Sequence, residues 1–219
     1  MSTHSSSSSL YFLTISIQPQ KEGVDVPYLI GKISDLFEKS TSTKLIHTFK
    51  VTCEAKVIII IQVSNIIALE RTIACLWKLG PIDVDCQPII FYESFAQNMK
   101  IADVLCTPSS CDLHKQPVYW LEFNIEYHGQ SFDDFLAIWK NEAETVLTLR
   151  SKGESNIELF KCLAQRKVHV LLNAADTTQL DHLSLQLPLM KDNGANILIK
   201  TKGVQFLGEY LSQISNNKQ

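Results

Sequence analysis

The chain has 219 residues, of which 45% are hydrophobic and 20% are charged, and its formal net charge is −3. This composition is typical of a soluble globular protein with one large domain or two small ones. The Lys and Arg residues are scattered, which argues against nucleic acid as a partner. Apolar runs such as residues 57–61 are far shorter than the roughly 20 residues that span a bilayer, so we expect no membrane span.

The N-terminal residues 1–9, MSTHSSSSS, contain neither Lys nor Arg and no apolar stretch. They therefore differ from a secretory signal and predict a disordered tail on a cytoplasmic protein. Six cysteines are spread along the chain, mostly within apolar segments, and we expect reduced thiols. Cys106 and Cys111 flank a loop and could form a bridge or bind a metal ion together with two His residues, but their spacing matches no standard zinc pattern.

Apolar periodicity predicts the elements of the first half of the chain. Residues 10–18 alternate apolar and polar side chains, as in a half-buried strand that Pro19 ends. Asp25 is placed to cap one helix and Asn65 to cap a second. The expected elements are strand 10–18, a helix from 26 to the corner at 40–43, strands 44–52 and 56–63, helix 66–78 and strand 82–92.

The second half shows the same order of elements, after a short helix at 94–105 and a polar linker at 106–117. Ser131 is placed to cap its long helix, and Asp133 and Asp134 follow in the first turn, where negative charge is favourable. The expected elements are strands 118–127, 156–164, 167–174 and 196–201, and helices 131–150, 178–190 and 206–214.

The two halves also match residue by residue. Phe160 lies 111 residues after Phe49 and is followed, like it, by a lysine. Lys167-Val168 lies 111 residues after Lys56-Val57. A period near half the chain length indicates a tandem duplication rather than a solenoid of short repeats.

Strand, helix, strand, strand, helix, strand is the βαββαβ order of a ferredoxin-like unit, in which both helices cover one face of an antiparallel sheet. The other face stays apolar and needs a partner. We therefore predict an α+β fold in which two such repeats pack sheet to sheet as an intramolecular pseudo-dimeric α+β barrel. The predicted boundaries are a tail at 1–9, repeats at 10–105 and 118–219, and a linker at 106–117. The chain would be a monomer, without need of further oligomerisation.

Three short stretches carry a resemblance to a known family. Residues 184–199, SLQLPLMKDNGANILI, resemble the helix end and closing strand of muconolactone isomerase, and residues 78–85, KLGPIDVD, are similar to the same corner. His47-Thr-Phe-Lys50 is similar to the His-x-Trp-Arg of that family's second strand. The resemblance implies the dimeric α+β barrel superfamily, whose members include isomerases, cyclases, monooxygenases and haem enzymes.

The resemblance implies a cofactor-free isomerase or cyclase that acts on a small carbonyl or lactone compound, and it supplies candidate catalytic residues. The family's proton-shuttling glutamate falls near Glu142, while the first repeat has Lys32 near that position. His47 is the second candidate. Because Trp139 lies one turn before Glu142, an aromatic wall would raise the proton affinity of the carboxyl. The alternative is that Glu142 and Glu144 belong to a solvated helix face.

A third catalytic candidate, Glu122, shares one face of its strand with Trp120 and Asn124. If that face is buried, these polar groups need partners; the alternative is that the face is exposed. His169 interrupts an apolar strand where the first repeat has Ile58, either as a ligand-binding residue or as a satisfied core histidine.

Aromatic residues supply the remaining candidates for a ligand pocket, with ordinary core positions as the alternative. No group of residues has the spacing of a metal site, and haem binding would need His47 or His169 as an axial ligand. The predicted ligand-binding residues are Tyr11, Phe12, Tyr119, Trp120, Trp139 and His169.

Two functions stay open on the sequence. The first is the small-molecule isomerase or cyclase that the resemblance implies. The second is a non-catalytic module for small-ligand binding or protein interaction, which the lack of a glutamate in the first repeat favours. The chain has no Gly-rich phosphate loop, no Gly-x-Ser-x-Gly motif and no Cys-x-x-Cys motif, which argues against nucleotide and nucleophilic chemistry.

Overall fold

The computed structural model describes residues 8–18, 23–41, 43–109, 112–115, 117–175 and 177–216. Most of the predicted tail, residues 1–7, lies outside the described residues, whereas Ser9 opens the first strand. Cys111, and with it the suggested bridge to Cys106, also lies outside them.

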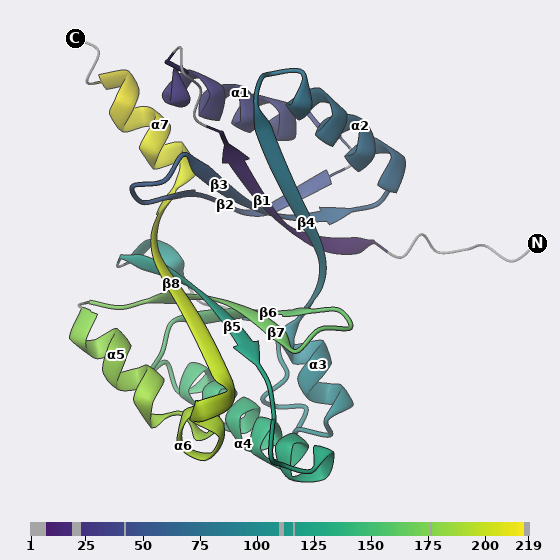
Figure 1. The fold of residues 1–219 in the computed structure, drawn as a ribbon, viewed down its shortest axis with the longest axis vertical. Helices are drawn as coiled ribbons and strands as arrows, with labels where there is room; N and C mark the ends of the chain where they lie inside the picture. Colours follow the sequence, from purple (N-terminus) through teal and green to yellow (C-terminus); the bar gives the residue numbers. More distant parts are fainter. Residues whose placement is uncertain are drawn as a thin grey trace, which may run out of the picture. The chain divides into compact units, whose positions relative to one another are not determined.

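The chain forms two compact units. Unit 1 comprises residues 1–89 and 204–219, and unit 2 comprises residues 90–203. In unit 1 the two longer helices cover one face of the strands (Figure 1). Its elements are β1 (Ser9–Ile17), α1 (Val26–Glu38), β2 (Thr43–Val51), β3 (Lys56–Val63), α2 (Ile66–Trp77), most of β4 (Ile82–Phe91) and α7 (Leu207–Asn216).

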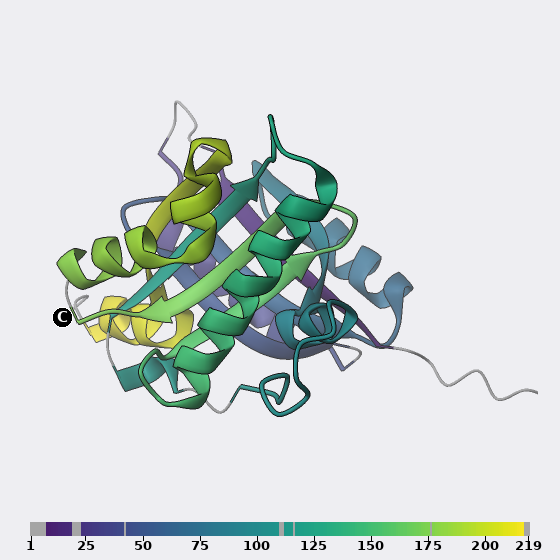
Figure 2. The ribbon, with the colours of Figure 1, turned by 90° about the horizontal axis from the view of Figure 1, so that it is seen from below.

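Unit 2 is built from the middle of the chain. Its long helix α4 lies across one face of the strands (Figure 2). The elements are α3 (Tyr92–Asn98), the 3-10 turn η1 (Leu113–Lys115), β5 (Val118–Ile125), α4 (Phe132–Ser151), β6 (Ile157–Cys162), β7 (Lys167–Asn173), α5 (Thr177–Gln186), α6 (Pro188–Asn193), the turn η2 (Gly194–Asn196) and most of β8 (Ile197–Phe206). The division differs from the sequence repeats because α3 belongs to unit 2 and α7 to unit 1.

The strands are joined by antiparallel pairs, such as β1 with β3 and β5 with β7. Their hydrogen-bonded order is β1-β3-β2-β8-β5-β7-β6-β4, which closes as a barrel. Within each unit, alternate strand residues enter a core under the helices, because side chains of a strand point to opposite faces in turn. In unit 2 this core contains Leu121, Phe123, Val168 and Val170.

Capping residues fix the helix starts where the sequence predicts them. The side chain of Asp25 accepts a hydrogen bond from the Tyr28 backbone N–H, and that of Asn65 accepts one from the Ile67 N–H. Ser131 accepts one from the Asp134 N–H at the start of α4. These bonds satisfy backbone donors that a helix leaves unpaired in its first turn.

Two predicted helices are wrong in extent. The helix expected at 94–105 is α3, which ends at Asn98. The helix expected at 178–190 is broken at Leu187, which has an extended backbone and caps the separate helix α6. The physical reason is Pro188, because a proline disfavours helical geometry at the residue before it and lacks the N–H that a helix interior needs.

A buried lysine closes the hairpin turn of each unit in the same way. Lys50 Nζ donates to the carbonyl oxygens of Val51, at 2.6 Å, and Glu54. Lys161 Nζ donates to those of Cys162, at 2.7 Å, and Gln165. Burial lowers the pKa of both lysines. Each turn also has one residue with a left-handed backbone, at the third position after the lysine: Cys53 (φ 59°) and Ala164 (φ 54°).

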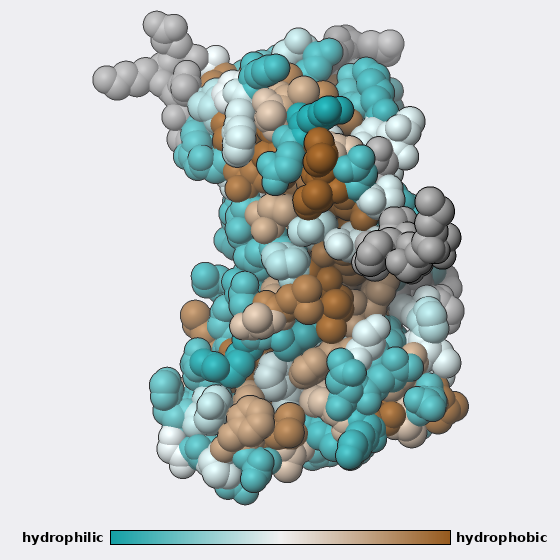
Figure 3. All heavy atoms as spheres, turned by 90° about the vertical axis from the view of Figure 1, so that its right-hand side faces the viewer, coloured by the Kyte–Doolittle hydropathy of each residue, from teal (hydrophilic) through white to brown (hydrophobic). Residues whose placement is uncertain are grey.

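No helix in the described part of the chain is both long and apolar enough to cross a membrane. On the face shown in Figure 3, hydrophobic residues lie in areas bordered by hydrophilic ones. The large apolar side chains that are more than half exposed include Tyr28, Ile67, Trp77, Phe132 and Leu198.

Candidate functional site

Unit 2 contains a cavity of about 40 Å³ between its sheet and its helices. The strands β5, β6 and β7 supply an apolar floor, and the helices α3, α4 and α6 supply the remaining walls. Among the described residues that line the cavity, the polar groups come from the helices, as Tyr92, Trp139 and Glu142. The apolar lining residues are Leu121, Phe123, Ile125, Val146, Ile157, Leu159, Val168, Val170, Leu172, Leu187 and Leu189.

The position of Glu142 on α4 explains its burial. Phe135, Trp139, Glu142 and Val146 follow one another at steps of three and four residues, so they share the buried face of the helix. Glu142 is only 6% exposed. The alternative of a solvated face is therefore wrong for Glu142, although it describes Glu144, which is half-exposed and lies 4.0 Å from the Lys140 ammonium.

The environment of Glu142 sets its charge. Burial raises the pKa of this carboxyl to about 7, and a hydrogen bond from the Leu189 backbone N–H partly opposes the rise. The donor nitrogen lies 3.0 Å from Oε2 of Glu142. Because burial disfavours the charged form, the carboxyl exists in both protonation states near neutral pH.

Tyr92 stands beside Glu142 and is a site residue that the sequence analysis missed. Trp139 Nε1–H donates to its hydroxyl oxygen over 3.2 Å. Burial and, second, the negative charge of Glu142 raise the pKa of Tyr92 above its usual range, so the phenol stays neutral. Tyr92 and Trp139 are 47 residues apart in the sequence and meet only because α3 packs against α4. No local sequence pattern therefore indicates that Tyr92 belongs to the site.

Three other candidates lie on the opposite face of the unit 2 sheet. Trp120 Nε1–H donates to Nδ1 of His169 over 3.2 Å, so Nδ1 is an acceptor and the neutral ring carries its hydrogen on Nε2. His169 is 1% exposed, and burial lowers its pKa to about 4. Because Val168 and Val170 line the cavity, alternation along β7 directs His169 away from it.

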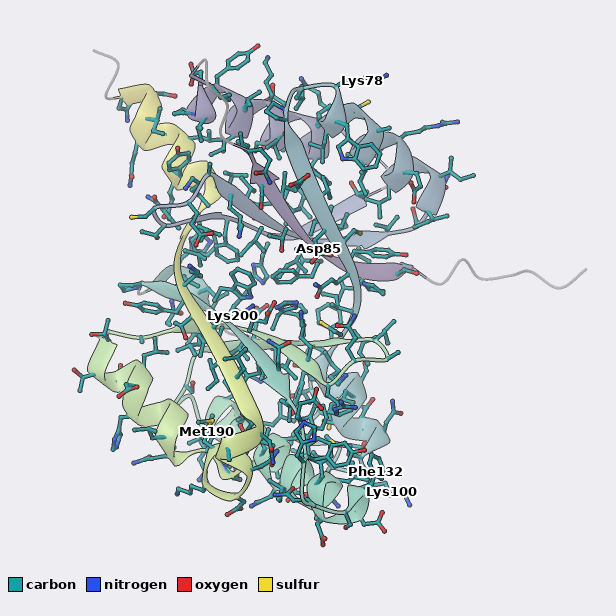
Figure 4. All side chains as sticks on the ribbon, in the orientation of Figure 1. Lys78, Asp85, Lys100, Phe132, Met190 and Lys200 are labelled. Atoms are coloured by element: carbon teal, nitrogen blue, oxygen red, sulfur yellow. The ribbon has the colours of Figure 1, made fainter. Side chains whose placement is uncertain are left out.

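Glu122 belongs to this opposite face as well and is half-buried. Asn124 Nδ2 donates to it over 3.1 Å, and the ammonium groups of Lys167 and Lys200 lie 3.4 and 3.8 Å away; Lys200 stands on β8 (Figure 4). Burial alone would raise the pKa of Glu122, but the Asn124 hydrogen bond and the Lys167 charge outweigh it and lower the pKa. This carboxyl therefore stays ionised, unlike that of Glu142.

The remaining candidates do not line the unit 2 cavity as described. Tyr119 is partly buried against the unit 2 core. Tyr11 and Phe12 on β1 and His47 on β2 belong to unit 1. The His47 ring centroid lies 5.8 Å from that of Phe49. Of the nine residues predicted from the sequence, the cavity thus brings together Glu142 and Trp139.

The cavity residues do not fit haem. Among the described residues that line it, no histidine, cysteine or methionine is present to hold the iron. The pKa of Tyr92 is raised rather than lowered, which disfavours the phenolate that an iron ligand requires. The described part of the chain also contains no group of three or more His, Cys, Asp or Glu residues able to hold a metal ion.

Comparisons with known proteins identify structures that share the fold of this chain. No family model matches the chain, and no curated protein matches it. Among solved structures, chlorite dismutase from Candidatus Nitrospira defluvii in complex with imidazole is 10% identical, with a TM-score of 0.57 over 93% of this chain and 94% of that one. An arginine-to-alanine mutant of the same dismutase is 10% identical, with a TM-score of 0.59 over 95% of each chain. The likeness to muconolactone isomerase is not shown by these matches. The chain therefore has the fold of these chlorite dismutase structures.

Proposed function

We propose that unit 2 binds a small, largely apolar compound in the cavity described above, and that the Glu142 carboxyl exchanges a proton with it. One observation carries the proposal: a carboxyl that is 6% exposed and has a pKa of about 7 projects into a mostly apolar lining, where it is the one carboxyl among the described residues. A group that is half protonated near neutral pH serves equally as acid or base.

The chemistry that suits this site is the shift of a proton next to a carbonyl group. The Glu142 carboxylate removes a proton from the carbon beside the carbonyl, and the electron pair of the C–H bond moves toward the carbonyl oxygen. In a compound with a C=C bond next to that carbon, the electron pair also extends over the C=C bond. The protonated carboxyl then returns the proton to the far carbon of that bond, which moves the double bond next to the carbonyl, isomerises the compound and restores the carboxylate. This is the class of reaction that the sequence resemblance implies. Glu122 is less suited because its lowered pKa makes it a weak base.

The volume of the cavity limits the ligand. About 40 Å³ accommodates a few water molecules. A larger ligand requires lining residues to move. One of them, Leu189, belongs to α6, a helix of 6 residues. The hydrogen bond between Glu142 and the Leu189 N–H ties that helix to α4, so ligand entry would act on the same carboxyl that handles the proton.

Haem is not part of this proposal. The chlorite dismutase-like neighbours are a haem-dependent family, so they give no support to the cofactor-free action that we expected from the sequence. Their likeness at about 10% identity concerns the fold, and the donor set of the described cavity does not suit iron.

A second candidate function is a non-catalytic binding module. It is favoured by the hydrogen bond from the Leu189 N–H, because Leu187, the cap residue of α6, offers no side-chain acceptor. In this alternative Glu142 serves as the missing cap.

We also infer that the two halves are ferredoxin-like repeats that arose by duplication. The matched lysines Lys50 and Lys161 support this inference. In this account one repeat kept the acid–base site.

Hydrogen exchange at a carbonyl compound tests the proposal. Wild-type protein is expected to accelerate deuterium uptake next to the carbonyl of cyclopentanone in heavy water at pH 7, measured by NMR. Glu142→Gln keeps the volume and the acceptor for the Leu189 N–H but cannot take up a proton, so uptake should fall to the buffer rate. Glu144→Gln, at a half-exposed position of the same helix, should exchange at the wild-type rate. Equal rates in wild type and Glu142→Gln would remove Glu142 from the chemistry.

A further inference from the structure

We infer that the Tyr92 hydroxyl recognises the carbonyl oxygen of the ligand and so restricts the site to neutral carbonyl compounds. This inference rests on the proposed function of the same cavity and goes beyond it in naming the recognition group. Tyr92 is 2% exposed and lines the cavity together with Glu142.

The direction of the hydrogen bond between Trp139 and Tyr92 leaves the Tyr92 hydroxyl hydrogen available to a ligand. An indole N–H only donates, so in the 3.2 Å contact between Trp139 Nε1 and the Tyr92 hydroxyl the tyrosine oxygen is the acceptor. The hydroxyl hydrogen of Tyr92 must therefore point elsewhere. No acceptor for it lies within hydrogen-bond distance among the described residues, and a buried donor without an acceptor is costly.

The neighbouring carboxyl completes a pair of donors. Glu142 is near enough for its charge to act on Tyr92, and in its protonated form it also offers an O–H. A carbonyl oxygen has two lone pairs and can accept from both groups. Once the Glu142 carboxylate removes the neighbouring proton, it no longer donates, and the neutral Tyr92 hydroxyl is the group that stabilises the negative charge developing on that oxygen.

The electrostatics select against charged ligands. Among the described residues that line the cavity there is no cation. Lys161 lies outside this lining, and its Nζ, 5.5 Å from the centre of the Trp139 ring, donates to the carbonyls of Cys162 and Gln165. A carboxylate or phosphate would therefore be buried without a counter-charge, which is strongly unfavourable. Neutral carbonyl compounds, such as ketones, aldehydes and lactones, do not carry this cost and are the ligands that we expect.

A pair of isosteric probes tests this inference. Cyclopentanone and methylenecyclopentane have nearly the same shape, but only the ketone has an oxygen. Binding of each to the full chain is measured by ligand-observed NMR at pH 6, where Glu142 is mostly protonated, in wild type, Tyr92→Phe and a cavity-enlarged Leu187→Ala variant. We expect the ketone to bind about tenfold more tightly than the hydrocarbon wherever Tyr92 is present, and this preference to shrink in Tyr92→Phe.

The infrared carbonyl band of bound cyclopentanone gives a second readout, independent of affinity. Hydrogen bonds from Tyr92 and protonated Glu142 should shift this band to a lower frequency than in an apolar solvent without hydrogen-bond donors. Tyr92→Phe should reverse part of that shift. If both probes bind with equal affinity, or the band and the preference are unchanged in Tyr92→Phe, Tyr92 does not recognise the carbonyl although the cavity still binds ligands. If neither probe binds wild type or Leu187→Ala, the proposed binding function fails, and the inference fails with it.

Discussion

The Oε2 atom of Glu142 accepts a hydrogen bond of 3.0 Å from the backbone N–H of Leu189. This contact joins the middle of α4 to the short helix α6, across the break that precedes Pro188. It holds a carboxyl in an apolar cavity where burial raises its pKa to about 7. The Glu142 side chain thus both joins α6 to α4 and titrates near neutral pH.

The stability of the protein should depend on pH through Glu142. Its pKa rises from 4.5 in the unfolded chain to about 7 in the folded one, so between these values the folded state binds more protons than the unfolded state. The contribution of this group is fully present below pH 4.5 and is lost as the pH rises through 7. From the pKa difference, the free energy of unfolding should fall by roughly 3 kcal/mol over this range relative to Glu142→Gln.

Urea unfolding of both proteins at pH 5 and pH 8 measures this difference. Glu144→Gln is the matched control, and it should follow the wild-type pH dependence because Glu144 is half-exposed. A wild-type curve parallel to that of Glu142→Gln would mean that the carboxyl titrates in the folded state as it does in water.

Removal of the α4 cap should cost stability. Ser131 Oγ accepts a hydrogen bond of 3.1 Å from the Asp134 N–H, and replacement of such a cap by alanine typically costs about 1 kcal/mol. Thr145→Ala removes a hydroxyl from the middle of the same helix, where it donates to the Asn141 carbonyl, and should change stability by less than about 0.5 kcal/mol. Chemical denaturation compares the two; equal losses would show that the cap has no special role.

The two buried lysines should contribute similarly to their units. Lys50→Met and Lys161→Met each remove an ammonium that donates to two carbonyls of a hairpin turn. Because carbonyl groups lose their donor, we expect each variant to lower the free energy of unfolding by roughly 1–3 kcal/mol. Thermal and urea unfolding report the loss. A large effect in one unit and none in the other would count against an equivalent role.

Haem should not bind specifically to this chain. The described residues that line the cavity include no histidine, cysteine or methionine, and His169 points to the other face with Nδ1 already accepting from Trp120. Titration with haemin should give an absorption spectrum without the Soret shift of an axially ligated haem, and His47→Ala and His169→Ala should behave like wild type. A saturable Soret shift that disappears in one of these variants would overturn this conclusion.

Local signals in the sequence were sufficient for most of the secondary structure. The side chains of Asp25, Asn65 and Ser131 cap the helices that the sequence predicts for them, because capping depends on residues within one turn. The prediction of one helix over residues 178–190 is wrong at Pro188, where α5 has ended and the separate helix α6 begins. Proline within a helical pattern is a local signal, so this feature was predictable.

The candidate site was predictable only in part. The burial of Glu142 follows from its spacing to Trp139 and Val146 on α4, and Glu122 and Asn124 do interact on one strand face, as alternation predicts. The contribution of Tyr92 was not predictable, because its contact with Trp139 joins elements that lie far apart in the sequence. The separation of Glu142 from Glu122 into opposite faces of the sheet likewise depends on how α4 packs, which local patterns do not report.

The protonation of Glu142 in the folded protein tests the central claim most directly. Carbon-13 NMR of the glutamate side-chain carboxyls, recorded from pH 3 to pH 9 in wild type and Glu142→Gln, isolates the Glu142 resonance as the one that the variant lacks. We predict a titration midpoint near pH 7, as burial in the cavity requires. A midpoint near 4.5, the value of a carboxyl in water, would contradict the buried acid–base group and the function proposed for it.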